Sequence, residues 1–399
     1  MIGYLRSFFN RNKKKIIVTT TIASLVYIGT RYIQDKINEF QERVEEENFA
    51  KEQIKRRFQQ TQKDCYLTFL SLIPVLNEPI FQDLPVEKIT NELQLKRLER
   101  QLGNGGDNNV GGSSTINSDD LSSSQSGSGI KSVNNSNSNS NSKSKTQLWS
   151  DLKIVSIARF LSAIYAQSML LVLIHIQLNI LSRKAYLATA IDLASKTQGI
   201  PIRSSLEDEE ELNFKDLEAE KKFLSLTYYL ISDGYKKIVK ECQIKVELIF
   251  KDINVRQELT IIDFFELIKK TAVSIKVDPN EVLGFLIDGN SEKLSPLSSL
   301  DINNNALNFN GNDKFEILKN ELINYFNSSE TLITIDHLFI GNIERIKNSL
   351  LSDNDATTNK KKLAALLVQL TKMTPNDDTQ QLQAIDELND LSASVYSNF

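Results

Sequence analysis

The stretch from Trp149 to about Lys196 contains neither glycine nor proline, the residues that most often interrupt a helix. Within it, the 22 residues of Phe160–Leu181 have no permanently charged side chain. A helix that is apolar nearly all round is either surrounded by other helices or crosses a membrane. Because polar residues recur near the end of this segment, we interpret it as a central core helix rather than as a membrane span. The whole stretch is either one very long helix or two.

Apolar residues recur at helical spacing along most of the chain after the N-terminal region. The segment Cys65–Leu76 predicts a core helix that ends near Pro74, because proline removes a backbone hydrogen bond. A hinge is predicted at Asp233-Gly234, between two further helices. No alternating strand pattern, βαβ rhythm or fixed repeat is found. The sequence therefore predicts an all-α fold, a single large helical bundle. Later helices are predicted at 315–326, 338–351, 360–373 and 379–395.

The N-terminal region is basic and then apolar. Residues 1–15 have a charge of +5, and an uncharged run extends from Ile16 to Thr30 and, across Arg31, to Ile33. As a helix, 16–33 would span about 27 Å, close to what a bilayer core requires. We predict a basic targeting segment at 1–15 and a retained transmembrane anchor helix at 16–33; a cleaved secretory signal and a buried soluble helix are the alternatives. The targeting residues are Arg6, Arg11, Lys13, Lys14 and Lys15.

The composition of the rest of the chain excludes several classes of protein. In the window 101–145, Ser, Asn and Gly make up 30 of the 45 residues, which predicts a disordered insertion. The chain after residue 15 has a net charge of −9, which argues against nucleic-acid binding. Cys65 and Cys242 are far apart, so the sequence indicates neither a disulfide framework nor a zinc ribbon, and it favours a reducing compartment.

Residues suited to catalysis are scarce. The chain has two histidines. His175 is predicted to be a hydrogen-bonded core imidazole, and His337 is predicted to lie at a helix N-terminus. No phosphate-binding loop, nucleophile elbow or metalloprotease motif is found. We therefore expect no enzyme activity, no cofactor, no metal site and no small-molecule substrate.

The single tryptophan indicates a binding function instead. Trp149 and Leu152 are three residues apart and share one face of the predicted helix, and Lys145 lies one turn earlier. An aromatic residue and a leucine near the start of a helix suit the amphipathic helix of a partner. The alternative is that Trp149 packs on the core.

Four segments of the sequence together resemble one known family. They read LRSFFNRNKKKIIVTT, VYIGTRYIQDKINEFQER, CYLTFLSLIPVL and LWSDLKIVSIARFLSAIYAQSMLLVLIHIQLNIL. Their order and spacing are similar to those of the peroxisomal biogenesis factor 3 (peroxin-3) family, in which a basic stretch, an anchor and a membrane-exit helix precede the core. The similar segments cover about residues 1–95 and 146–190, and the window 101–145 interrupts them as an insertion.

The resemblance implies a docking receptor in the peroxisomal membrane. In this family, a cytosolic helical domain binds the chaperone peroxin-19, which delivers newly made peroxisomal membrane proteins for insertion. The chaperone presents an amphipathic helix to a hydrophobic groove, and the matching residues here are Trp149, Leu152, Lys145 and Leu93. Membrane lipids are the other implied partner. A membrane tether or organelle-contact adaptor that does not use the chaperone is the alternative function.

The resemblance also implies a domain organisation and an orientation. The cytosolic domain would consist of residues 34–100 and 146–399, on either side of the insertion. The family has its basic N-terminus on the matrix side and its large C-terminal domain in the cytosol. The positive-inside rule would instead keep the basic end in the cytosol. We follow the family and expect a single-pass protein of the peroxisomal membrane.

Overall fold

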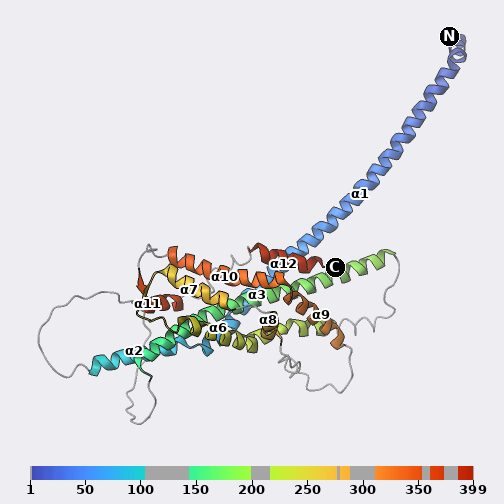
Figure 1. Cartoon of the computed structure of the whole chain (residues 1–399). Helices are drawn as coiled ribbons and strands as arrows, with labels where there is room; N and C mark the ends of the chain where they lie inside the picture. The colour runs from blue at the N-terminus through green and yellow to red at the C-terminus, as the bar shows by residue number, and fades with distance from the viewer. Residues whose placement is uncertain are drawn as a thin grey trace, which may run out of the picture. The chain divides into compact units, whose positions relative to one another are not determined.

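The computed structural model describes residues 2–103, 143–198, 216–275, 279–287, 311–352, 360–372 and 385–398 (Figure 1). Contacts divide the chain into two units, Met1–Asp64 and Cys65–Phe399. The backbone of the first unit is helical from Ile2 onward, as part of α1 (Ile2–Asp83). The side chains of residues 2–30 lie outside the described part, so the targeting segment and the anchor at 16–33 remain predictions. Residues 104–142, most of the predicted insertion, also lie outside it.

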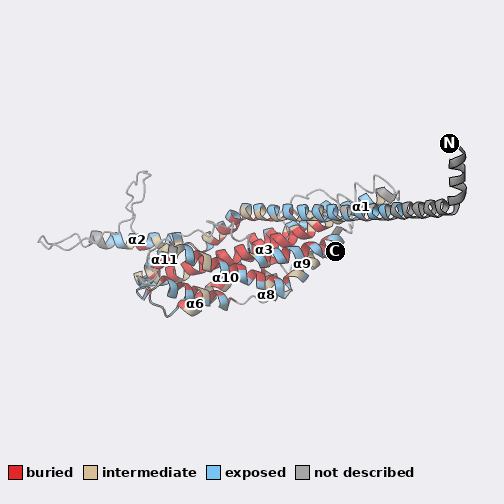
Figure 2. Ribbon diagram, turned by 90° about the horizontal axis from the view of Figure 1, so that it is seen from above, coloured by how far each residue is buried: buried red, intermediate tan, exposed pale blue. Residues whose placement is uncertain are grey.

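The second unit is built around α3 (Lys145–Gln198), a single helix of 54 residues. The stretch without glycine and proline is therefore one unbroken helix and not two. Figure 2 shows buried residues along most of α3. Within the described residues, the one helix long and apolar enough to cross a membrane is Lys145–Ser195, and its most apolar window is entirely buried. The prediction that Phe160–Leu181 is a core helix is confirmed.

Other helices pack around the buried part of α3. This arrangement is the all-α bundle that the sequence predicts. The only strands in the described part are two antiparallel residue pairs, β1 (Glu258–Leu259) and β2 (Lys361–Lys362). The remaining elements are α2 (Val86–Gly103), a helix at 216–224, α5 (Leu226–Tyr229), the π-helix η1 (Leu230–Gly234), α6 (Tyr235–Phe250), α7 (Ile261–Ser274), α8 (Pro279–Leu286), α9 (Gly311–Phe326), α10 (Ser329–Ser352), α11 (Leu363–Lys372) and α12 (Asp386–Ser397).

The predicted helix end at Pro74 is wrong. Helix α1 continues through Pro74 and Pro79 to Asp83. The buried residues Phe69, Ile73 and Leu76 follow one face of α1 past the first proline. Burial of this continuous apolar face compensates for the backbone hydrogen bond that each proline removes. The chain turns at Pro85, which separates α1 from α2.

The predicted hinge at Asp233-Gly234 is also wrong. The chain passes from η1 into α6 without leaving the helical region of backbone angles. Gly234 has a different role, because a Cβ atom placed on it would lie 1.9 Å from the carbonyl oxygen of Phe285. The glycine is therefore required for close approach of α8 to the π-helix.

The two histidines differ in their surroundings. His337 lies in the interior of α10, contrary to the prediction of a helix N-terminus, and its Nδ1 is 2.7 Å from Oε1 of Glu387 on α12. His175 is buried in α3, and its Nδ1 is 2.9 Å from Oγ of Ser392 on α12. The prediction of a hydrogen-bonded core imidazole is confirmed.

Burial of His175 makes the stability of the domain depend on pH. Burial lowers the pKa of His175 from 6.5 to about 4. The unfolded chain binds a proton below pH 6.5, whereas the folded chain does so only below about pH 4, so the free energy of unfolding falls as the pH drops through this window. The expected loss from this group between pH 7 and pH 5 is about 2 kcal/mol. Urea unfolding at several pH values measures it. The variant His175→Gln should show a flatter dependence, and equal slopes in the two proteins would contradict the prediction.

Candidate partner-binding groove

A groove of about 550 Å³ lies between α2, α3 and α11. It is lined mainly by apolar residues and by the stems of long polar ones. Its lining residues are Val86, Glu87, Thr90, Asn91, Leu93, Gln94 and Arg97 from α2, Lys145, Trp149, Leu152 and Ser156 from α3, and Leu367, Val368, Thr371 and Lys372 from α11.

The four residues selected from the sequence all line this groove. Leu93 and Leu152 are buried in a small apolar cluster that is separate from the main core and also contains Val86 and Leu148. Trp149 is half-buried and packs against this cluster, so one part of its ring system belongs to the cluster and another faces the groove. Lys145 is half-buried at the first residue of α3. Both interpretations of Trp149, packing and partner contact, are compatible with this position.

The local sequence fixes where α3 begins. The Oγ atom of Ser144 accepts a hydrogen bond of 3.2 Å from the backbone N–H of Gln147. The side chain of Gln147 accepts one of 3.3 Å from the backbone N–H of Ser144. This reciprocal arrangement is a capping box, which starts the helix one turn before Trp149. Lys145 and Trp149 are therefore on the same helix, four residues apart.

Helix α11 is the wall of the groove that sequence reasoning did not find. Leu367 is buried, whereas Val368 is 44% exposed at the groove. An exposed valine on a short apolar helix is a weak signal, because single exposed apolar residues are common on protein surfaces. More than 200 residues separate Val368 from Trp149, and no sequence pattern relates two such distant positions.

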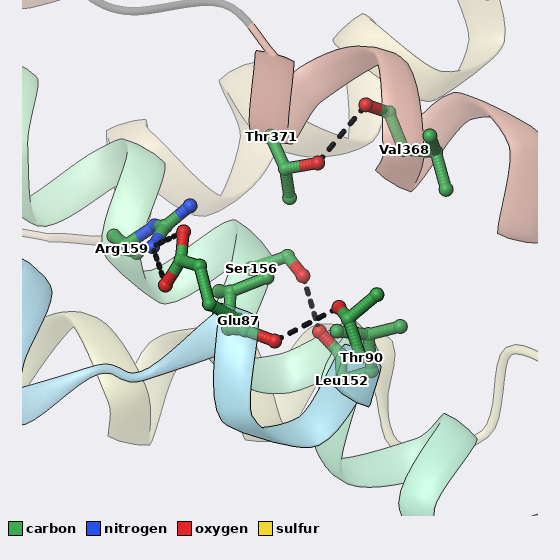
Figure 3. A network of polar contacts seen from close by, with 8 residues as sticks. Glu87, Thr90, Leu152, Ser156, Arg159, Val368 and Thr371 are labelled. Atoms are coloured by element: carbon green, nitrogen blue, oxygen red, sulfur yellow. Dashed lines mark hydrogen bonds and ion pairs between the residues drawn. The ribbon is translucent and has the colours of Figure 1, made fainter. Parts of the chain in front are cut away.

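An ion pair joins Glu87, a groove residue in the first turn of α2, to α3 (Figure 3). Arg159 is buried on α3 and donates hydrogen bonds of 2.7 and 2.8 Å to the two carboxylate oxygens of Glu87. The guanidinium carbon of Arg159 is also 4.9 Å from the ring centre of Phe81 on α1. Burial alone would raise the pKa of Glu87. The hydrogen bonds from Arg159, a backbone hydrogen bond and the charge of Arg159 together outweigh burial and lower that pKa. Arg159 thereby holds α2 in place as a wall of the groove.

The hydroxyl groups near the groove are satisfied by their own helices. Thr90 donates to the carbonyl of Val86 at 2.9 Å, and Thr371 donates to the carbonyl of Val368 at 2.9 Å (Figure 3). An apolar side chain that enters the groove therefore leaves neither hydroxyl donor without a hydrogen-bond partner. A buried donor without a partner would cost free energy.

The charged residues that line the groove are mostly basic. Glu87 is neutralised by Arg159, whereas Arg97, Lys145 and Lys372 lie around the groove as cations. The domain as a whole is acidic, so this basic rim is a local departure from its average charge. It favours a partner with acidic residues beside its apolar face.

The described residues contain no cluster of three or more His, Cys, Asp or Glu side chains that could hold a metal ion. Neither histidine lines the groove. Cys65 and Cys242 are both buried free thiols, and burial raises the pKa of Cys242 to about 12. The groove therefore offers apolar contact and charge rather than reactive groups.

Comparison with known proteins decides the family. The Peroxin-3 family model matches residues 7–398 of the chain. The Peroxisomal membrane protein PEX3 of Komagataella phaffii is 40% identical over an alignment of length 461, which covers 100% of both chains. The chain belongs to the Peroxin-3 family. This result confirms the family that the four sequence segments indicated.

Two further members of the Peroxin-3 family are less similar to this chain than the Komagataella phaffii protein is. The Peroxisomal biogenesis factor 3 of Debaryomyces hansenii is 33% identical over 443 residues, covering 99% of this chain and 98% of that protein. The Peroxisomal biogenesis factor 3 of Mus musculus is 25% identical over 276 residues, covering 69% of this chain and 58% of the mouse protein. Peroxin-3 membership gives the chain a role in peroxisome biogenesis and membrane protein handling. Its relatives are named as membrane proteins and biogenesis factors, not as enzymes.

Proposed function

We propose that this chain is a docking receptor for the chaperone peroxin-19, and that the groove between α2, α3 and α11 receives the chaperone's amphipathic helix. The observation that supports this function is the convergence of Trp149, Leu152, Lys145 and Leu93 on one groove. These residues belong to two segments of the sequence on either side of residues 101–145, and the fold brings them together. A binding protein of this kind needs no cofactor and performs no reaction.

The groove has the features that an amphipathic helix requires. Its floor is the apolar cluster around Leu93 and Leu152, and Trp149 offers an aromatic anchor at its edge. Buried aromatic anchors supply much of the free energy in such contacts. A segment that folds on binding loses conformational entropy, and burial of its apolar face in the groove offsets that loss. Acidic residues on the partner would pair with Lys145, Arg97 or Lys372 at the rim.

Helix α11 provides a test of the groove that is independent of the residues chosen from the sequence. The variant Val368→Asp places a carboxylate on the α11 wall, where it would have to be desolvated by an apolar partner. We expect it to weaken binding of the chaperone's N-terminal helix at least tenfold. Isothermal titration of the full chain with a peptide of that helix measures the effect. The matched control is Ile333→Asp, an exposed residue of α10 that does not line the groove. Equal affinities for the two variants would exclude α11 from the docking surface.

We further propose that residues 16–33 anchor the chain in the peroxisomal membrane, where it contacts lipids, with the groove domain in the cytosol. Two findings support the membrane anchor: relatives named as peroxisomal membrane proteins, and the uncharged run after a basic N-terminus. Protease treatment of intact peroxisomes should digest the C-terminal domain and spare an epitope placed at the N-terminus. Digestion of the N-terminal epitope with protection of the domain would reverse the orientation.

A further inference from the structure

A second depression, of about 370 Å³, lies far from the groove, toward the other end of α3. Three helices form it: α3, the helix at 216–224 and α9. At 1.5 Å per residue, α3 places Lys184 about 50 Å from Trp149. Each helix contributes residues three or four positions apart. The lining residues are Leu181, Lys184, Ala185, Ala188, Asp216, Ala219, Glu220, Lys314, Ile317 and Leu318.

The floor of this depression is apolar and lies close to the α3 backbone. Ala185 and Ala188 are exposed small residues one turn apart, and they allow another helix to approach α3 closely. The apolar surface extends one turn further along α3 to Ile191, which is 55% exposed. On the opposite wall, Ile317 of α9 is also 55% exposed. The surface is therefore elongated along α3, which suits a helix better than a small compact ligand.

Two of the four charged residues at this depression are already paired. Lys314 of α9 forms an ion pair with Asp216. Lys184 and Glu220 differ from them, because both are half-buried and neither lies within ion-pair distance of an opposite charge among the described residues. Burial lowers the pKa of Lys184, although the nearby acids Glu321, Glu220 and Asp216 attract its charge. Burial together with Asp216 raises the pKa of Glu220, although Lys184 attracts its charge. Each charge is therefore incompletely compensated within one chain.

We propose that this surface, here named the α3 end patch (Lys184, Ala185, Ala188, Glu220 and Ile317), binds a second copy of the same chain. A two-fold interface needs a patch that is complementary to itself. A surface that combines apolar side chains with one cation and one anion, neither of them in an ion pair within the described residues, meets this requirement, since a two-fold rotation can place Lys184 of each copy opposite Glu220 of the other. The same contact leaves both grooves free, because the groove lies toward the opposite end of α3.

Charge reversal tests the pairing directly. The full chain would be labelled in two colours, reconstituted in detergent, and its association measured by energy transfer over a range of concentrations. The wild type should associate. Lys184→Glu alone places two acids in each patch, Glu220→Lys alone places two bases, and each should associate about tenfold or more weakly because like charges then face each other. A mixture of the two variants should recover wild-type association, since every cross-pair is again of opposite sign.

The mixture also separates pairing from misfolding, because a variant that had lost its fold would not be restored by another. Circular dichroism and thermal melting of each variant check the fold independently. The matched control is Lys222→Glu, on the same 216–224 helix, which removes only an exposed pair with Glu218. Three outcomes would overturn the proposal: no association of the wild type, association that charge reversal leaves unchanged, or a mixture as weak as the single variants. Association through the N-terminal helix would give the second outcome.

Discussion

Replacing Trp149 with alanine is expected to weaken binding of the chaperone helix by about 2 kcal/mol or more, which is roughly thirtyfold in Kd. Part of the side chain already packs on the cluster of Leu93 and Leu152, so its ring is held in place before the partner arrives. An anchor that is held rigidly loses little conformational entropy on binding. Truncation removes both the contact area and this preorganisation.

Calorimetric titration of the full chain with the chaperone peptide measures this loss, and circular dichroism checks that the helix content is unchanged. Trp149→Phe should retain part of the affinity, because phenylalanine keeps an aromatic ring on the cluster. Leu248→Ala is the control, since Leu248 of α6 is 75% exposed and lies outside the groove. If Trp149→Ala bound as tightly as the wild type, the packing interpretation of Trp149 would be sufficient and the docking site would lie elsewhere.

Gly234→Ala is expected to destabilise the domain by about 1–3 kcal/mol, the usual cost of forcing extra atoms into a packed site. The added Cβ atom would lie 1.9 Å from the carbonyl oxygen of Phe285, which belongs to the backbone and is not a flexible side-chain end. Helix α8 must therefore move away from η1. That movement would disturb the hydrogen bond of 2.7 Å from Lys237 to the carbonyl of Gly284.

Gly341→Ala provides a matched comparison, because Gly341 lies within α10 and a Cβ atom there would meet nothing within 4 Å. Alanine is the better helix former, so this variant should gain up to about 1 kcal/mol. Urea unfolding of both variants measures the two effects. Similar changes in both proteins would show that the contact with α8 does not determine the stability at Gly234.

The long helix was the most predictable part of the fold. Residues 146–198 contain no glycine or proline to interrupt a helix. A helix that is apolar nearly all round has to be covered on every side, as a helix at the centre of a bundle is. The prediction of a helix end at Pro74 fails because it considers only the lost backbone hydrogen bond. The buried face of Phe69, Ile73 and Leu76 continues past Pro74 and stabilises the helix there. Gly234 was assigned to a hinge for the same reason. Its contact with Phe285 is between segments about 50 residues apart and leaves no local signature.

The groove was predictable in part. Helical spacing related Trp149 to Leu152 and Lys145, and family resemblance added Leu93 from α2. Spacing alone did not distinguish a docking surface from core packing, and the position of Trp149 in the fold includes both. The α11 wall was missed because α11 lies next to α3 only after the chain has folded. Local sequence determines each helix that lines the groove, whereas the groove itself forms only when these helices pack together.

The positions of α2 and α3 are fixed by contacts outside the segment that connects them, and this has a consequence for the evolution of the chain. Arg159 and Glu87 hold the start of α2 on α3, and the capping box at Ser144 fixes the start of α3. The two walls therefore do not depend on the connecting residues for their positions. Loop-closure entropy grows only with the logarithm of length, at about 0.6 kcal/mol for each doubling. Residues can be gained or lost between the walls at little thermodynamic cost, so mutation can change the length of the connection while the groove is preserved.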